Sequence, residues 1–181
     1  MTRDKKLKAI AFEIEQCLIC RQGKSGKAVP GEGSSFAEIM FVGEAPGRNE
    51  AETGRPFIGR SGKLLRKAIV DIGLKENEVF ITSPVKYLPD YKTPNEEDIQ
   101  HGMIHLAKQI EIINPKILVL LGSVAVRGVL GEKLLMSKSH GKMIKRGNRT
   151  FFIAYHPAAA IRFVKFKTKF LEDFQALRNL I

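Results

Sequence analysis

The sequence of 181 residues contains no tryptophan, only two cysteines, and no apolar run long enough to cross a membrane. A membrane-spanning helix needs roughly 18 or more consecutive apolar residues, and without tryptophan an interfacial helix lacks its usual anchor. Near the amino terminus Glu13 and Glu15 interrupt the apolar residues, which argues against a secretory signal. These absences predict a cytoplasmic protein with no membrane partner, and the 44% hydrophobic content predicts a sizeable core.

Acidic residues are missing from one long stretch of the chain. Between Lys133 and Leu171 there are ten Lys and Arg and no Asp or Glu, whereas the remainder carries 20 basic and 19 acidic side chains. Almost all of the net charge of +11 therefore belongs to one segment. A local excess of this kind favours a polyanionic partner such as DNA or RNA. The alternative is a solvated basic face that only aids solubility.

The two cysteines, Cys17 and Cys20, have the spacing C-x-x-C. In a cytosolic protein this spacing indicates metal or redox chemistry before a structural disulfide. Two thiolates alone do not complete a tetrahedral metal site, so further ligands would have to come from elsewhere in the chain.

Segments with strand and helix patterns alternate along the chain, which predicts a parallel sheet covered on both faces, an α/β architecture. The length fits one domain over residues 1–181. We expect three strands at 39–42, 79–82 and 117–121, and a β-ribbon over 142–155 that leads into a fourth strand at 151–155. The expected helices are 4–20, 62–72 with Ser61 as its cap, 95–113, 122–130 and 164–181. In such folds ligands bind outside the carboxyl ends of the strands, which here lead into loops at 43–59, 83–94 and 155–162.

Two of these loops carry side chains suited to a planar ligand. Glu44 follows the first strand within a tight turn, and Phe57 is an aromatic side chain that can stack on a base or simply pack in the loop core. His156 follows the last strand and can donate a hydrogen bond to an anionic leaving group, although a lone histidine is more often structural. Neither loop has the Walker pattern or G-x-G-x-x-G, so a common phosphate loop is not indicated.

Ordered motifs along the chain resemble those of the family 4 uracil-DNA glycosylases. They are GEAPG at 43–47, TGRPFIG at 53–59, GKLL at 62–65, VK at 85–86 and HPAA at 156–159. The match runs from about Cys17 to the carboxyl terminus. It implies a three-layer αβα sandwich around a four-stranded parallel sheet, and an enzyme that hydrolyses the bond between uracil and deoxyribose in DNA to start base excision repair.

The resemblance implies a role for each matching residue. Such an enzyme extrudes the base from the duplex and reads its edge in a pocket. Glu44 and His156 match the catalytic positions: the carboxylate stabilises the sugar cation or orients water, and the imidazole stabilises the uracil anion. The residues expected to bind the base are Gly43, Ala45, Phe57 and Ser83. Arg162 and Lys165 in the basic segment are expected to contact DNA phosphates.

Two positions depart from the family pattern. The family usually has Asn in the sequence Ile-Thr-Asn after the second strand, where this chain has Ser83, whose single hydroxyl cannot provide a paired donor and acceptor. The family also binds a [4Fe–4S] cluster through four cysteines. Cys17 and Cys20 match the first pair, but Tyr87 and His101 stand at the other two positions. We expect no cofactor, with the cluster lost or replaced and the cysteines left as buried thiols or a short-range disulfide.

The leading interpretation is a divergent glycosylase for uracil or a related deaminated base, acting as a monomer on DNA in the cytoplasm and associated with the nucleoid. The alternative is a weak or inactive homologue that binds DNA or a damaged base without excision. The changes at Ser83 and at the cluster positions favour the alternative, whereas Glu44, Phe57 and His156 together favour the enzyme.

Overall fold

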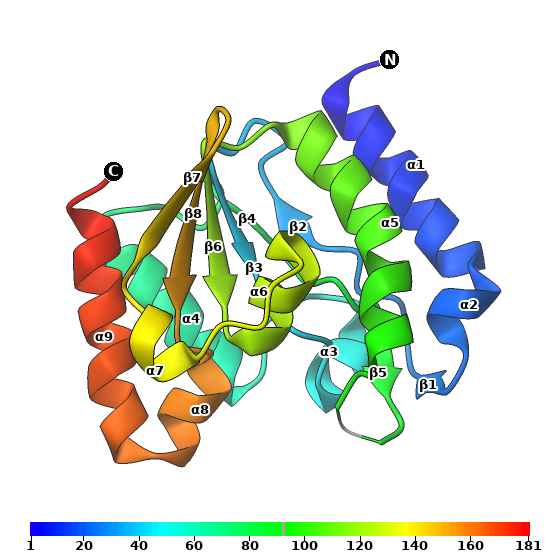
Figure 1. The fold of residues 1–181 in the computed structure, drawn as a ribbon. Helices are drawn as coiled ribbons and strands as arrows, with labels where there is room; N and C mark the ends of the chain where they lie inside the picture. Colours follow the sequence, from blue (N-terminus) through cyan, green and yellow to red (C-terminus); the bar gives the residue numbers. More distant parts are fainter. Residues whose placement is uncertain (92) are drawn as a thin grey trace.

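A computed structural model describes residues 1–91 and 93–181 of the chain. Its centre is a six-stranded sheet with the order β2-β4-β3-β6-β8-β7, flanked by helices (Figure 1). The strands are β2 (Glu32–Gly33), β3 (Ile39–Val42), β4 (Phe80–Thr82), β6 (Ile117–Leu121), β7 (Met143–Arg146) and β8 (Arg149–Ala154), and a separate two-stranded ribbon pairs β1 (Lys24–Ser25) with β5 (Leu88–Pro89).

The four central strands, β4, β3, β6 and β8, are parallel to one another. This confirms the predicted α/β sandwich, but the sheet has six strands and not four. The two additional strands, β2 and β7, pair antiparallel at the edges. The short strand β2 has no apolar pattern of its own and exists only through its pairing with β4, so the sequence predicts no strand there.

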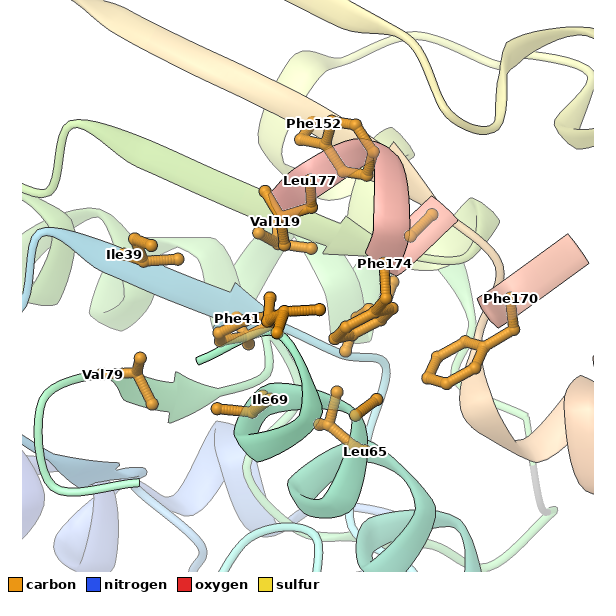
Figure 2. Packing of buried hydrophobic residues seen from close by; sticks show 14 of the residues in the cluster. Ile39, Phe41, Leu65, Ile69, Val79, Val119, Phe152, Phe170, Phe174 and Leu177 are labelled. Atoms are coloured by element: carbon orange, nitrogen blue, oxygen red, sulfur yellow. The ribbon is translucent and has the colours of Figure 1, made fainter. Parts of the chain in front are cut away.

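Every residue of β3 is buried because both faces of the sheet are covered by helices. Alternate side chains therefore enter two different cores. Ile39 and Phe41 point into the core on one face, shown in Figure 2. There Phe174 of the carboxyl-terminal helix stacks on Phe41, and Phe170 packs on Phe174. Met40 and Val42 enter the core on the opposite face.

Helices α4 (Arg60–Asp71), α8 (Pro157–Arg162) and α9 (Val164–Arg178) contact one another, and α4 and α9 contribute to the core of Figure 2. Helices α1 (Arg3–Gln16), α5 (Glu96–Ile113) and α6 (Ser123–Leu130) contribute to the other core. The short helices are α2 (Leu18–Arg21), α3 (Arg48–Thr53) and α7 (Met136–Ser139). Among the described residues, no helix is both long and apolar enough to span a lipid bilayer.

The structure corrects several predicted boundaries. The helix expected at 4–20 is interrupted at Cys17, whose extended backbone ends α1 and caps α2. Helix α4 begins at Arg60 with Gly59 as its cap, so Ser61 is not the cap. The loops expected at 43–59 and 155–162 contain α3 and α8, both only six residues long. Within the loop expected at 83–94, residues 88–89 form β5, and residue 92 lies outside the described residues.

Candidate active site

The carboxyl ends of β3, β4 and β8 open into a cavity of about 570 Å³. Its walls include six of the side chains predicted from the sequence, Glu44, Ala45, Phe57, Ser83, His156 and Arg162. Lys165 lies outside this wall on α9, with its ammonium group 5.0 Å from the centre of the Phe166 ring. The topology therefore brings together side chains that are more than 100 residues apart in the chain.

Phe57 lies against the turn that follows β3. A side chain on Gly43 would come within 2.4 Å of the Phe57 ring, so only glycine fits beneath it. Gly62 likewise lets α4 approach the Phe57 carbonyl, since a Cβ there would lie 2.0 Å from it. Phe57 itself has a φ of 51°, a left-handed conformation that costs a residue with a side chain about 1–3 kcal/mol. The surrounding structure must therefore hold it in place.

Two side chains that the sequence did not single out hold this strained loop. Oε1 of the buried Glu50 accepts hydrogen bonds from the amides of Ile58 and Gly59, both at 2.8 Å, and its Oε2 accepts one from Gly47 at 3.1 Å. The Arg66 guanidinium donates to the carbonyl oxygen of Phe57 at 2.9 Å. The G-x-x-E spacing from Gly47 is the only sequence signal for Glu50, as a capping-box pattern, and nothing in the sequence marks Arg66.

Glu44 presents a half-buried carboxylate to the cavity. Among the described residues, no side chain or amide donates a hydrogen bond to it. Burial raises the pKa of Glu44 above its ordinary value, and the positive charge of Arg127 opposes part of this shift. An ionised carboxylate without a donor, beside a cavity, is suited to hold a water molecule or to stabilise a developing positive charge.

His156 caps the first turn of α8, where its Nδ1 accepts a hydrogen bond from the amide of Ala158 at 3.1 Å. Because Nδ1 is the acceptor, the proton of the neutral ring lies on Nε2. Burial lowers the pKa of His156 to about 4, so the ring is neutral at physiological pH. Its ring centre lies 5.9 Å from that of Phe57, with the planes tilted by 35°. The site therefore places a neutral N–H donor beside an aromatic face.

Ser83 is buried at the end of β4, and its hydroxyl donates to the carbonyl oxygen of Val85 at 2.8 Å. This bond uses the only proton of the hydroxyl and leaves its lone pairs as acceptors. Ser83 can therefore accept a hydrogen bond from a base but cannot donate one in this conformation.

A second hollow lies beside the cavity and is lined by three arginines, Arg48, Arg60 and Arg162. Within the described parts of the chain, none of the three forms an ion pair with a carboxylate. Arg162 also lines the cavity, so the two hollows are continuous at this residue. Arg48 and Arg60 could not be expected here from the sequence, because they lie outside the basic segment and meet it only through the fold.

The basic segment of residues 133–171 does not form one face. Its hairpin of β7 and β8 turns at the amino ends of the parallel strands, as Figure 1 shows. The cavity residues follow the opposite, carboxyl ends of these strands. Arg162 and Lys165 lie at the carboxyl ends instead, in α8 and α9. Only part of the segment is therefore placed to contact a ligand of the cavity.

The C-x-x-C pair lies apart from the cavity, between α1, α2 and α5. Neither Cys17 nor Cys20 forms a disulfide, and Nε2 of His101 is 3.1 Å from the Cys17 sulfur. The fourth member of this group is His105, which the sequence analysis did not consider although it follows His101 by one helical turn. Tyr87 is not a member: its hydroxyl donates to backbone carbonyl oxygens of α1 at 3.4 Å.

Comparison with known proteins gives this site a context. The sequence profile of the uracil DNA glycosylase superfamily matches residues 30–178. The chain is 40% identical to a type-4 uracil-DNA glycosylase of Sulfurisphaera tokodaii, over 96% of this chain and 84% of that protein. It is 36% identical to the type-4 enzyme of Archaeoglobus fulgidus, over 94% and 91%, and 32% identical to that of Thermotoga maritima, over 99% and 97%. The chain belongs to the uracil-DNA glycosylase superfamily.

Proposed function

We propose that this protein is a uracil-DNA glycosylase of type 4, which hydrolyses the N-glycosidic bond of uracil in DNA and so starts base excision repair. The observation that carries the proposal is the cavity in which Glu44, Phe57 and neutral His156 meet. The names of the relatives support it, since five similar proteins that match along nearly the whole chain are type-4 uracil-DNA glycosylases.

Each group has a definite part in the proposed reaction. The base leaves the duplex and stacks on the Phe57 ring. The bond between C1′ of the sugar and N1 of the base breaks, with its electron pair going to the base and positive charge growing on the sugar. The Glu44 carboxylate stabilises that charge, orients the water that adds to C1′ and accepts the proton that this water loses. The Nε2 proton of His156 forms a hydrogen bond to the base oxygen that becomes negative.

The DNA backbone lies along the arginine-lined hollow in this proposal. Arg48, Arg60 and Arg162 contact phosphates next to the extruded nucleotide, and Lys165 extends the contact on α9. We expect residues 1–181 to form a single domain that acts as a monomer. Because its substrate is DNA, we expect the protein to work in the cytoplasm, associated with the nucleoid.

The base preference follows from Ser83. Its oxygen can accept the N3–H of uracil, but the site lacks the paired amide that would also donate to the neighbouring carbonyl. We therefore expect weaker discrimination between uracil and other deaminated bases than a bidentate contact gives.

Single-turnover excision tests the proposal directly. Labelled strands carrying uracil, hypoxanthine, xanthine or ethenocytosine are incubated with excess enzyme, and abasic sites are revealed by alkaline cleavage. We expect uracil to be excised, and Glu44→Gln to lose excision while retaining DNA binding. Tight binding of all strands with no abasic product from any of them would refute the enzyme and identify a binding protein.

A further inference from the structure

The side chains of Cys17, Cys20, His101 and His105 meet at the junction of α1, α2 and α5. Each offers one ligand atom, and these four atoms all lie within 4.8 Å of one another. The group is separate from the proposed catalytic residues, because none of its members lines the cavity that holds Glu44 and His156. Its chemistry therefore needs its own explanation.

The local fold directs all four side chains to one point. The backbone of Cys17 is extended, with φ −77° and ψ 108°, which breaks the helix and turns α2 back so that both thiols face the same side. The amide of Cys20 points at the Cys17 sulfur over 3.5 Å. His101 and His105 are four residues apart on α5 and therefore share one face of that helix.

The burial of His105 is independent evidence that this group binds an ion. His105 is only 3% exposed, and neither of its ring nitrogens has a hydrogen-bond partner among the described residues. A buried polar atom without a partner is unfavourable, and a bound water or ion is one of the explanations for such an atom in a native structure. The carboxylate of Glu13 lies 3.6 Å from Nδ1, just beyond hydrogen-bond distance, where it can orient a ring that binds metal through Nε2.

These distances do not fit the [4Fe–4S] cluster that the family resemblance implies. Such a cluster binds each ligand through a separate iron atom, so its ligands surround a body several atoms wide. Here the Cys17 sulfur and the His101 nitrogen are 3.1 Å apart, which is close enough for both to bind one metal ion. In addition Tyr87, at the third cluster position, directs its hydroxyl to carbonyl oxygens of α1.

We propose that Cys17, Cys20, His101 and His105 bind a single zinc ion with tetrahedral geometry. Zinc–sulfur and zinc–nitrogen bonds of about 2.3 and 2.0 Å separate the ligand atoms of a tetrahedral site by roughly 3.3–3.8 Å, close to the arrangement seen here. Within each pair the spacings C-x₂-C and H-x₃-H are those of structural zinc sites, and the fold brings the two pairs together across the long separation between Cys20 and His101. Four protein ligands leave no open position, so the ion is structural and joins the α1–α2 turn to α5.

Metal analysis and cobalt substitution test the site without relying on enzyme activity. The full-length protein purified without chelator is expected to contain about one zinc per chain and neither iron nor acid-labile sulfide. After zinc removal, titration with Co²⁺ should give the intense visible absorption of a tetrahedral thiolate site, saturating at one equivalent. Stoichiometric iron with sulfide would overturn the proposal, and so would a pale octahedral cobalt spectrum.

Variants on α5 and α1 identify the ligands. His105→Gln should reduce bound zinc from about one per chain to near zero, whereas Ala107→Gln, at an exposed position of the same helix, should leave it unchanged. Glu13→Gln should weaken Co²⁺ binding about tenfold, as removal of an orienting carboxylate typically does. Glu15→Gln is its control. Full zinc occupancy in a folded His105→Gln variant would refute the assignment. If that variant does not fold, the Co²⁺ spectrum of the wild type and the comparison of Glu13→Gln with Glu15→Gln still decide the question.

Discussion

Burial shifts the pKa of both proposed catalytic side chains, Glu44 and His156, away from their ordinary values. It raises the pKa of Glu44, and it lowers the pKa of His156 to about 4. Both shifts favour the neutral form, but their consequences at neutral pH differ. The histidine remains an uncharged donor, while ionising the buried carboxylate carries an energetic cost that the folded protein bears. The same environment thus destabilises the fold slightly and prepares a reactive group.

Replacing Glu44 by Gln should separate stability from activity. A carboxyl whose folded pKa is raised contributes stability at low pH that is lost as the pH rises through the folded pKa, because the folded state then has to ionise a buried group. At pH 7 Glu44→Gln should therefore unfold at a higher urea concentration than wild type, while single-turnover excision falls roughly 10²-fold or more. Asp90→Asn, at the exposed rim of the same cavity, is the control. If Glu44→Gln excises uracil as fast as wild type, Glu44 has no catalytic role.

His156 should make the protein sensitive to acid. With a folded pKa of about 4, the ring is neutral in the folded state between pH 4 and 6.5 but protonated in the unfolded chain. The stability from this group is therefore complete above about pH 6.5 and falls by up to about 3 kcal/mol on acidification to pH 4. Urea unfolding from pH 7 to pH 4 should show a steeper loss for wild type than for His156→Gln. Parallel curves would mean that the imidazole titrates normally.

Ser83→Asn tests how the base edge is read. An amide at this position restores a paired donor and acceptor, which is worth about 1–3 kcal/mol for a bidentate base contact. Uracil excision should become roughly 10- to 100-fold faster relative to hypoxanthine and xanthine, measured in single turnover on matched strands. Pro84 restricts the backbone of residue 83 and so limits the directions in which an Asn side chain can point. Ser83→Ala is the control, because it also loses the hydrogen bond to the Val85 carbonyl oxygen. A Ser83→Asn variant that no longer excises uracil would show that the pocket is shaped for another base.

At the scale of elements, the Glu50 carboxylate holds the loop from Gly43 to Gly59 together with the Arg66 guanidinium. Glu50 accepts hydrogen bonds from three backbone amides and in this way connects the start of α3 to the start of α4. Phe57, with its left-handed backbone, lies between them. The loop is therefore ordered by charged side chains and not by regular pairing. Its shape determines where the Phe57 ring lies, and with it the geometry proposed for the base.

Glu50→Gln should loosen this loop. Hydrogen bonds to a charged acceptor contribute about 1.5–3 kcal/mol each, and the Gln amide would direct an N–H toward one of the donors. We expect the free energy of unfolding to fall by about 2 kcal/mol and excision to slow, because Phe57 loses its fixed position. Glu52→Gln on the same helix, where the side chain is exposed, should match wild type in both urea unfolding and excision. Equal behaviour of the two variants would show that the loop is held by other contacts.

The elements that the sequence predicted well are those with a strong pattern of their own. The apolar runs at 39–42 and 117–121 form β3 and β6 at those bounds, and Asn95 caps α5 as a polar residue before an acidic first turn. The elements that were missed include β1, β2, β5, α3, α7 and α8. All of them have at most six residues, and the three strands exist only through pairing with strands elsewhere in the fold. Local patterns carry no information about such partners.

The candidate site divides in the same way. Glu44 and His156 could be predicted because they directly follow strands whose carboxyl ends meet at one edge of the sheet. Glu50 and Arg66 could not, because their partners are backbone groups of a loop whose path the sequence does not reveal. His105 could be predicted only in part. Its spacing from His101 is visible in the sequence, but the sequence does not show that α5 packs beside Cys17.

At the scale of the whole molecule, the distribution of charge and the strand topology together determine which side we expect to face DNA. The net charge of +11 attracts a polyanion from any direction. The cavity and the arginine-lined hollow both lie at the carboxyl ends of the parallel strands, while the β7–β8 hairpin carries further basic residues at the opposite end. A specific complex should therefore use one of these two basic regions and leave the other in solvent.

The salt dependence of binding distinguishes the two regions. Each phosphate contact releases counterions, so log affinity for duplex DNA falls with log salt with a slope of about −0.9 per contact. The double variant Arg162→Ala and Lys165→Ala should make this slope shallower by about 1.8, since two contacts are lost. The matched double variant Lys145→Ala and Arg149→Ala removes the same charge from the hairpin and should leave the slope unchanged. Fluorescence anisotropy on a labelled duplex at several salt concentrations measures both slopes. Equal flattening by the two variants would show that attraction is spread over the whole surface, and an effect of the hairpin variant alone would move the DNA face to the other end of the sheet.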